Sequence, residues 1–190
     1  MLKNLIGITS KHIMDEVEAR SLEQTMDVLV RAYGETHRFT ATDLCDCHRT
    51  WLGNIYEWAG RYRLVNVSKD GFPFAAAAQV PTLMDQFERD VLRRYTPCTF
   101  ADQADVVRAL AETHVELVLI HPFRDGNGRF ARVLSSLMAL RAGLPLLDFS
   151  LMAGTGKTAY IAATQAGLDK HYVPMESLFG KVIEQNRSSS

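Results

Sequence analysis

The chain has 190 residues, of which 47% are hydrophobic and 23% charged, and its formal net charge is −1. These values predict one globular domain with a substantial core and give no reason to expect nucleic acid or a membrane as a direct partner. No apolar run reaches the roughly 20 residues needed to cross a bilayer, and the N-terminal segment turns charged too early for a secretory signal, so we expect a cytoplasmic protein.

Apolar residues at helical spacing predict a helix over residues 10–33, with Ser10 as its N-cap, and a second helix from Ala41 to Trp58 that Gly60 ends. Residues 62–75 instead alternate β-branched and polar residues around Asp70-Gly71, which is a strong hairpin signal. Further helices are predicted over residues 81–95, 102–120, 127–142, 157–167 and 174–187.

The predicted fold class is therefore mostly α, with one small β-hairpin that must lean on helices or on a partner. The chain shows no repeat and no linker. We divide it into an N-terminal helical region (1–40), one compact main domain (41–187) and a disordered serine tail (188–190).

Two short segments imitate known sites. Cys45-Asp-Cys47-His48 suggests zinc, but no second ligand pair follows at a finger-like spacing, so a buried helix face is the favoured interpretation. Residues 154–158, GTGKT, are similar to a phosphate-binding loop, but Leu151 stands where that pattern needs glycine. We interpret them as a loop entering a helix and leave open whether Lys157 lies near a nucleotide base.

The segment HPFRDGNGRFAR, residues 121–132, carries the strongest chemical signal. Gly126 and Gly128 let the backbone approach a large ligand, and the helix that begins there offers free N–H groups to an anion. Arg129 and Arg132 are three residues apart, which predicts that both project from the same side of the first turn. Two guanidinium groups beside a glycine-rich turn favour a polyphosphate, of which ATP is the abundant one.

The other residues of the segment supply the remaining roles. Asp125 could hold Mg²⁺ against phosphate oxygens, and Asn127 could donate a hydrogen bond to a phosphate. His121 could take a proton from an incoming hydroxyl at neutral pH. Phe123 is interpreted as an apolar anchor that pins the loop to the core. Taken singly, each residue also fits a plain helix start with surface arginines and a structural histidine.

The segment resembles the Fic-family signature H-x-F-x-[DE]-G-N-G-R-x-x-R at every fixed position. Residues 48–74 look like a helix and hairpin "flap" of that family. The matching signature positions are His121, Phe123, Asp125, Gly126, Asn127, Gly128, Arg129 and Arg132. The resemblance extends to the tail at Tyr160, Ala163, Gly167, Asp169, Tyr172, Pro174 and Leu178.

This resemblance implies a Fic-type helical bundle that transfers AMP from ATP to a hydroxyl of another protein and releases pyrophosphate. It implies His121 as general base, Asp125 as Mg²⁺ ligand, and Asn127 with the loop amides around the transferred phosphate. It places the departing phosphates with Arg129 and Arg132. The flap, around 67–74, would bind the target as an added strand, with Lys69 or Phe72 clamping it. We count Phe123 and Lys69 with the residues of the nucleotide site.

Alternatives within the fold remain open at this stage. Related Doc kinases transfer the γ-phosphate and carry lysine at the position of Gly128, so the glycine favours AMP transfer. Phosphocholine transfer uses a closely similar motif. A catalytically silent nucleotide- or peptide-binding module would lack the histidine, which is present here as His121.

Regulation is suggested by a missing motif. Many Fic proteins carry an inhibitory helix with the pattern [ST]-x-x-x-E-[GN], and no glutamate of this sequence fits it. Arg132 therefore has no evident internal partner, which favours inhibition by a separate small antitoxin. A divergent inhibitory segment or control by oligomerisation remains open. By the same resemblance, DNA gyrase or topoisomerase IV is the expected target.

Overall fold

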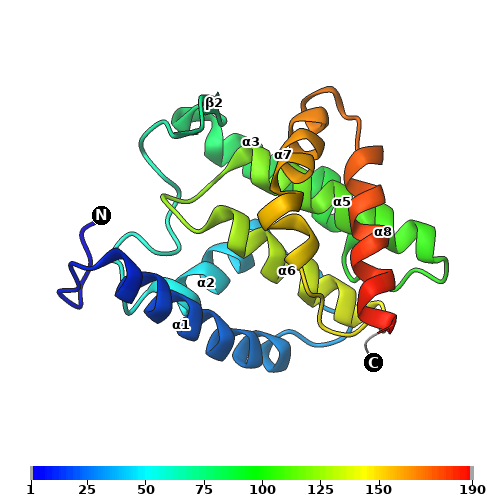
Figure 1. Cartoon of the computed structure of the whole chain (residues 1–190), viewed down its shortest axis with the longest axis horizontal. Helices are drawn as coiled ribbons and strands as arrows, with labels where there is room; N and C mark the ends of the chain where they lie inside the picture. Colours follow the sequence, from blue (N-terminus) through cyan, green and yellow to red (C-terminus); the bar gives the residue numbers. More distant parts are fainter. Residues whose placement is uncertain (1, 189–190) are drawn as a thin grey trace.

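A computed structural model of the chain describes residues 2–188 and confirms a mostly helical fold with one small antiparallel hairpin (Figure 1). The helices are α1 (Lys11–Ala32), α2 (Ala41–Leu52), α3 (Val80–Phe87), α4 (Arg93–Tyr95), α5 (Gln103–Ile120), α6 (Asn127–Arg141), α7 (Lys157–Ala166) and α8 (Val173–Ser188). Of the tail predicted to be disordered, Ser188 ends α8, and residues 189–190 lie outside the described part.

Helix α5 forms the centre of the bundle. It packs along α6 and α8 and also contacts α3 and α7, while α1 lies against α2 and α6 (Figure 1). The apolar stripe predicted for residues 102–120 accounts for this position, since Val106, Leu110, Leu117 and Val118 are all buried. The loop between α5 and α6 leaves this core at one end, and that loop together with the first two turns of α6 contains every predicted site residue except Lys69.

Helix α2 is shorter than predicted, and the extension to Trp58 was wrong. The helix ends at Leu52, and the Leu52 carbonyl then accepts bonds from both Ile55 N and Tyr56 N. The resulting turn still buries Ile55 and Tyr56, so the apolar spacing was read correctly as core but wrongly as continuous helix. The turn also brings Gly60, with φ +72°, back against α2.

The hairpin is confirmed in its turn but is smaller than residues 62–75. Strand β1 (Ser68–Lys69) pairs antiparallel with β2 (Phe72–Pro73), with Lys69 opposite Phe72. Asp70 and Gly71 both have positive φ, 51° and 82°, as a two-residue hairpin turn requires. Residues 62–67 run as irregular chain: Arg63 N donates to Pro122 O in the α5–α6 loop, and Val67 O accepts from Phe74 N just beyond the two strands.

The other predicted helices are found close to their expected bounds. The segment predicted over 81–95 runs through α3, a π-helical stretch (Glu88–Leu92) and α4. Short 3-10 turns precede or join the later helices, at Ala77–Gln79, Ser150–Met152, Gly154–Gly156 and Gly167–Asp169. The Gly154–Gly156 turn enters α7, so GTGKT is a loop entering a helix, as interpreted.

Candidate active site

One large cleft, with a volume of about 1160 Å³, opens between α1, the hairpin, the α5–α6 loop and the start of α7. Its size suits a nucleotide-sized ligand. The structure brings nearly all of the predicted site residues to this cleft: Lys69, His121, Asp125, Gly126, Asn127, Gly128, Arg129 and Arg132. Phe123 is the exception, because it is fully buried beneath the loop.

His121 lies at the C-terminal end of α5, in the left-handed conformation with φ 53° and ψ 58°. Such a backbone costs energy in a residue with a Cβ, so the surroundings must hold it. Its Nδ1 lies 3.0 Å from the Val118 carbonyl, and its ring stacks on Phe74 at 3.6 Å. Because Nδ1 donates to that carbonyl, the neutral ring keeps the Nε2 lone pair as a proton acceptor.

Burial lowers the pKa of His121 to about 4, and the positive charges of Arg63 and Lys69 act in the same direction. The imidazole is therefore neutral at physiological pH, which is the state that a general base needs. The lowered pKa also makes the His121 imidazole a weaker base than that of an exposed histidine. The bound substrate would have to supply negative charge nearby to raise that pKa during reaction.

Arg63 is a functional candidate that the sequence analysis missed. Its side chain is buried, and its donors go to backbone carbonyls: Nε to His121 O at 2.6 Å, Nη1 to Val65 O at 2.8 Å and Nη2 to Ala75 O. Its own N–H donates to Pro122 O at 2.9 Å. Arg63 thus ties the base of the hairpin to the strained backbone at His121. In the sequence, Arg63 stands in a stretch that alternates β-branched and polar residues, where an arginine normally indicates a solvated side chain.

The underside of the loop is held by three residues. The Phe123 ring stacks on the His48 ring at 3.9 Å. Gly60 N donates to His48 Nδ1 at 3.0 Å, so Nε2 carries the proton and donates to Asp125 O at 3.1 Å. The Asn127 side chain accepts from Phe123 N and donates to Phe123 O, at 2.8 and 2.9 Å. Asn127 therefore shapes the loop, and only its second amide hydrogen is left for a ligand.

The two glycines of the loop have different functions. Gly126 has φ +81°, and a Cβ on it would lie 2.8 Å from the Trp51 ring, so both conformation and space require glycine. A Cβ on Gly128 would meet nothing within 4 Å, because this residue faces the open cleft. The first intrahelical bond of α6 runs from Phe130 N to Gly126 O, so the three N–H groups before Phe130 have no helical partner.

Asp125 has chemistry that fits a magnesium ion. Its side chain is 56% exposed in the cleft, and Oδ1 accepts from Gly126 N at 2.6 Å, which leaves Oδ2 for a cation. No group of three or more potential metal-ligating residues is found among residues 2–188. A single carboxylate suits Mg²⁺ when phosphate oxygens and water complete the shell, and does not suit a site built from protein alone.

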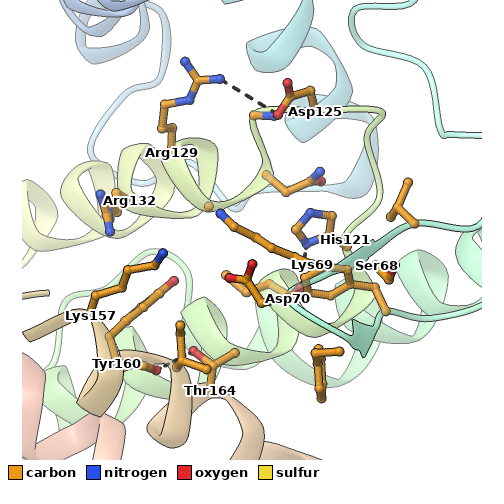
Figure 2. Close-up of a pocket in the computed structure, with 18 of the residues that line it drawn as sticks. Ser68, Lys69, Asp70, His121, Asp125, Arg129, Arg132, Lys157, Tyr160 and Thr164 are labelled. Atoms are coloured by element: carbon orange, nitrogen blue, oxygen red, sulfur yellow. Dashed lines mark hydrogen bonds and ion pairs between the residues drawn. The ribbon is translucent and has the colours of Figure 1, made fainter. Parts of the chain in front are cut away.

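The two arginines line the same cleft, but their guanidinium groups turn to different neighbours (Figure 2). Arg129 Nη1 lies 2.5 Å from the buried Glu18 carboxylate of α1, and the guanidinium lies 4.9 Å from the Trp51 ring centre. Its Nη2 is 4.0 Å from Asp125 Oδ1. Arg129 is therefore already paired with acids, which three-residue spacing alone does not reveal.

Arg132 turns toward α7, on the side of Lys157 and Tyr160 (Figure 2). Its guanidinium carbon lies 5.6 Å from the Tyr160 ring centre and 5.9 Å from that of Phe149. Among residues 2–188 it forms no ion pair, and its buried Nε has no hydrogen-bond partner. Lys157 lines the same part of the cleft.

The hairpin forms the opposite wall of the cleft. Lys69 and Phe72 both line it, and Phe72 packs edge-on against Phe74, the ring that covers His121. Ser68 and Lys69 are exposed, so the outer edge of β1 is open to solvent. A peptide segment could pair with such an edge while presenting a side chain to the cleft.

A histidine, a carboxylate and a glycine-rich helix start thus meet in one cleft of a helical bundle, an arrangement able to bind a phosphate group and to accept a proton beside it. The sequence model of the Fic/DOC family matches residues 38–139, which is more than half of the chain. The chain therefore belongs to the Fic/DOC family, as the signature at residues 121–132 indicated.

Two curated relatives show how far the similarity extends. The chain is 30% identical over 153 residues to the protein adenylyltransferase VbhT of Bartonella schoenbuchensis, covering 75% of this chain and 30% of that protein. It is 27% identical over 150 residues to a protein adenylyltransferase Fic of Nematostella vectensis, covering 76% and 33% respectively. The chain thus spans about a third of the length of these relatives.

Solved structures share the fold over nearly the whole chain. BepC of Bartonella tribocorum, solved with bound AMPPNP, superposes with a TM-score of 0.78 at 23% identity, covering 96% of this chain and 91% of that one. The Fic domain of a VirB-translocated effector from Bartonella quintana, solved with bound ADP, gives 0.78 at 25% identity, covering 96% and 90%. No helix among residues 2–188 is long and apolar enough to span a membrane.

Proposed function

We propose that this chain is a protein adenylyltransferase, which transfers AMP from ATP to a hydroxyl side chain of another protein. The observation that carries the proposal is the pairing of a neutral His121, whose Nε2 keeps its lone pair, with the start of α6 in one cleft: this helix has no side-chain cap, and Gly128 in its first turn leaves open space. The names of the adenylyltransferase relatives and the nucleotides bound in two similar structures support it.

The reaction follows from the positions of these groups. The target hydroxyl oxygen attacks the α-phosphorus, and its proton passes to His121 Nε2. The new P–O bond forms as the bond from the α-phosphorus to the bridging oxygen breaks, and pyrophosphate leaves with the electron pair. The N–H groups at the start of α6 stabilise the charge on the transferred phosphate, and Arg132 stabilises the departing phosphates.

Asp125 is the residue that would hold Mg²⁺, through Oδ2. Bound there, the ion would neutralise phosphate charge. Arg129 is the second phosphate contact in this proposal, although its pairing with Glu18 limits the charge that it can offer. Lys69, on the opposite wall, would orient the target or the nucleotide.

The target is proposed to bind as an added strand on β1, with its hydroxyl residue over His121. By resemblance to the toxin members of the family, a type II topoisomerase, DNA gyrase or topoisomerase IV, is the target to test first, in the cytoplasm. We also propose inhibition by a small separate antitoxin that brings a glutamate to Arg132, because Arg132 makes no ion pair with any residue that the structure describes.

The proposal is tested with α-labelled and γ-labelled ATP, Mg²⁺ and a bacterial lysate. We expect label on a protein band from the α-labelled nucleotide only, and loss of that label in His121→Ala. His171→Ala is the matched control, because His171 is exposed and does not line the cleft. It should leave transfer unchanged.

Other labelling patterns would replace the proposal. Label from γ-labelled ATP alone would indicate a kinase. If neither nucleotide labels a protein band, and His121→Ala is indistinguishable from the unmodified chain, the chain is a binding module. Purified gyrase and topoisomerase IV, each added alone, then test the target directly.

A further inference from the structure

The two arginines of the signature have opposite electrostatic environments, although both line the cleft. Arg129 is held by a carboxylate: Glu18, only 4% exposed, takes its Nη1 at 2.5 Å and also accepts from Tyr56 Oη at 2.5 Å. Arg132 is held by rings, Tyr160 and Phe149, each within 6 Å of its guanidinium carbon. An acid partner neutralises an arginine, whereas a ring attracts it and leaves its charge intact.

The Tyr160 ring is itself fixed by a chain of buried hydrogen bonds. Ser135 Oγ donates its single hydrogen to Ala131 O at 2.9 Å, so it can only accept from His114 Nδ1, which lies 3.1 Å away. With the proton on Nδ1, His114 Nε2 accepts from Tyr160 Oη at 2.9 Å. His114 is 1% exposed, and its burial lowers its pKa to about 3, so this neutral tautomer persists at physiological pH.

Nothing that the structure describes neutralises this end of the cleft. Neither Arg132 nor Lys157 forms an ion pair within residues 2–188, and Arg132 Nε is a buried donor without a partner. A buried, unsatisfied donor is costly and needs an explanation. A bound anion at the guanidinium would supply the opposite charge that these two side chains lack.

From these contacts we infer that Tyr160, fixed by the Ser135–His114 chain, is a positioning residue that holds Arg132 ready for the terminal phosphates of the nucleotide. This inference rests on the proposed function and adds a division of labour to it. Arg132 has its full charge available to the leaving phosphates, whereas Arg129 mainly ties α6 to α1. Tyr160 acts only through Arg132, so its contribution should vanish with the arginine or with the phosphates that it binds.

The test compares dissociation constants for ATP and AMP, measured by calorimetry on the full chain with Mg²⁺. Arg132→Gln should weaken ATP binding at least tenfold and change the dissociation constant for AMP by less than twofold. Tyr160→Phe keeps the ring but loses the hydrogen bond to His114. It should weaken ATP binding three- to tenfold and AMP binding less than twofold. Phe149→Leu approaches the guanidinium from another segment and should give the same selective loss.

A double variant and a matched control make the result specific. In the Arg132→Gln background, Tyr160→Phe should change ATP binding by less than twofold. Tyr172→Phe is the control, because it also removes a tyrosine hydroxyl that is bonded to a side chain, Glu116, but lies outside the cleft. It should leave both constants unchanged.

The inference is overturned if Tyr160→Phe weakens ATP and AMP equally, because the tyrosine would then contact the nucleoside or support the fold. It is also overturned if the loss persists in the Arg132→Gln background, or if no variant alters ATP binding while the unmodified chain binds ATP. That last result would leave the proposed function standing. An unmodified chain that neither binds ATP nor transfers AMP would instead refute the proposed function.

Discussion

Glu18 is a buried acid beside a cleft that we propose for a polyanion. Its carboxylate takes the Arg129 guanidinium on one oxygen and the Tyr56 hydroxyl on the other, and Trp51 Nε1 donates to its backbone carbonyl at 2.9 Å. The acid thereby joins α1 to α2 and α6. Glu18 belongs to no motif, so nothing in the sequence pattern predicts its contact with Arg129.

We expect Glu18→Gln to destabilise the fold by about 1–2 kcal/mol, because Arg129 loses its charged partner. The loss stays moderate because the Arg129 side chain is itself partly exposed to water. Urea unfolding measures the change. Glu16→Gln on the same helix is the control, since Glu16 is exposed and should have no measurable effect. Equal stability of Glu18→Gln and the unmodified chain would show that the pair contributes nothing.

At the scale of elements, the hairpin and the α5–α6 loop form one unit through Arg63. Both segments present backbone carbonyls to this side chain, at Val65 and Ala75 on one side and at Ile120 and His121 on the other. The hairpin has only two residues in each strand and could not order itself alone. Arg63 therefore links the orientation of the base to the wall on which the target would bind.

Arg63→Lys should uncouple the two segments, because one ammonium cannot reach four carbonyls. We expect AMP transfer to fall at least tenfold while ATP affinity stays within about twofold. Hydrogen exchange of residues 67–75 should rise in parallel. Arg61→Lys, at an exposed neighbouring position, serves as control. Unaltered exchange in the hairpin of Arg63→Lys would contradict this coupling.

The sequence predicted which helices exist better than where they end. It also predicted the signature residues better than the residues that hold them in place. Helices with a continuous apolar stripe, such as α5, were found where expected, whereas α2 stopped six residues short of Trp58 because Leu52 O accepts two turn bonds. The signature residues are contiguous, so their meeting at one cleft follows from local geometry. Glu18, Arg63 and Tyr160 reach the site only through tertiary packing, which no spacing records.

For the chain as a whole, three imidazoles with lowered pKa values make stability depend on pH. Burial lowers the pKa of His48 to about 4, that of His114 to about 3 and that of His121 to about 4, from 6.5 in the absence of such burial. Between pH 6.5 and these values the unfolded chain binds more protons than the folded chain. The free energy of unfolding therefore falls as pH is lowered through this range.

We expect each imidazole to remove up to roughly 1.4 kcal/mol of stability per pH unit below about pH 6. Urea unfolding at pH 7.0, 6.0 and 5.0 measures the slope, and His114→Gln should have a shallower slope than the unmodified chain, even if it is less stable at pH 7. His171→Gln should keep the full slope, because this histidine is exposed. A flat profile for the unmodified chain would mean that none of the three rings resists protonation.

The cleft is lined by more basic than acidic side chains, which affects how ligands arrive. Its lining has six basic side chains against four acidic ones: Lys11, Lys69, Arg124, Arg129, Arg132 and Lys157, and Asp15, Glu18, Asp70 and Asp125. Although the formal net charge of the chain is −1, positive charge is therefore in excess around the cleft. Such a field attracts anions from a distance of about one Debye length, roughly 8–10 Å at physiological ionic strength. Capture of the nucleotide should consequently slow as salt is added, long before the folded state itself is affected.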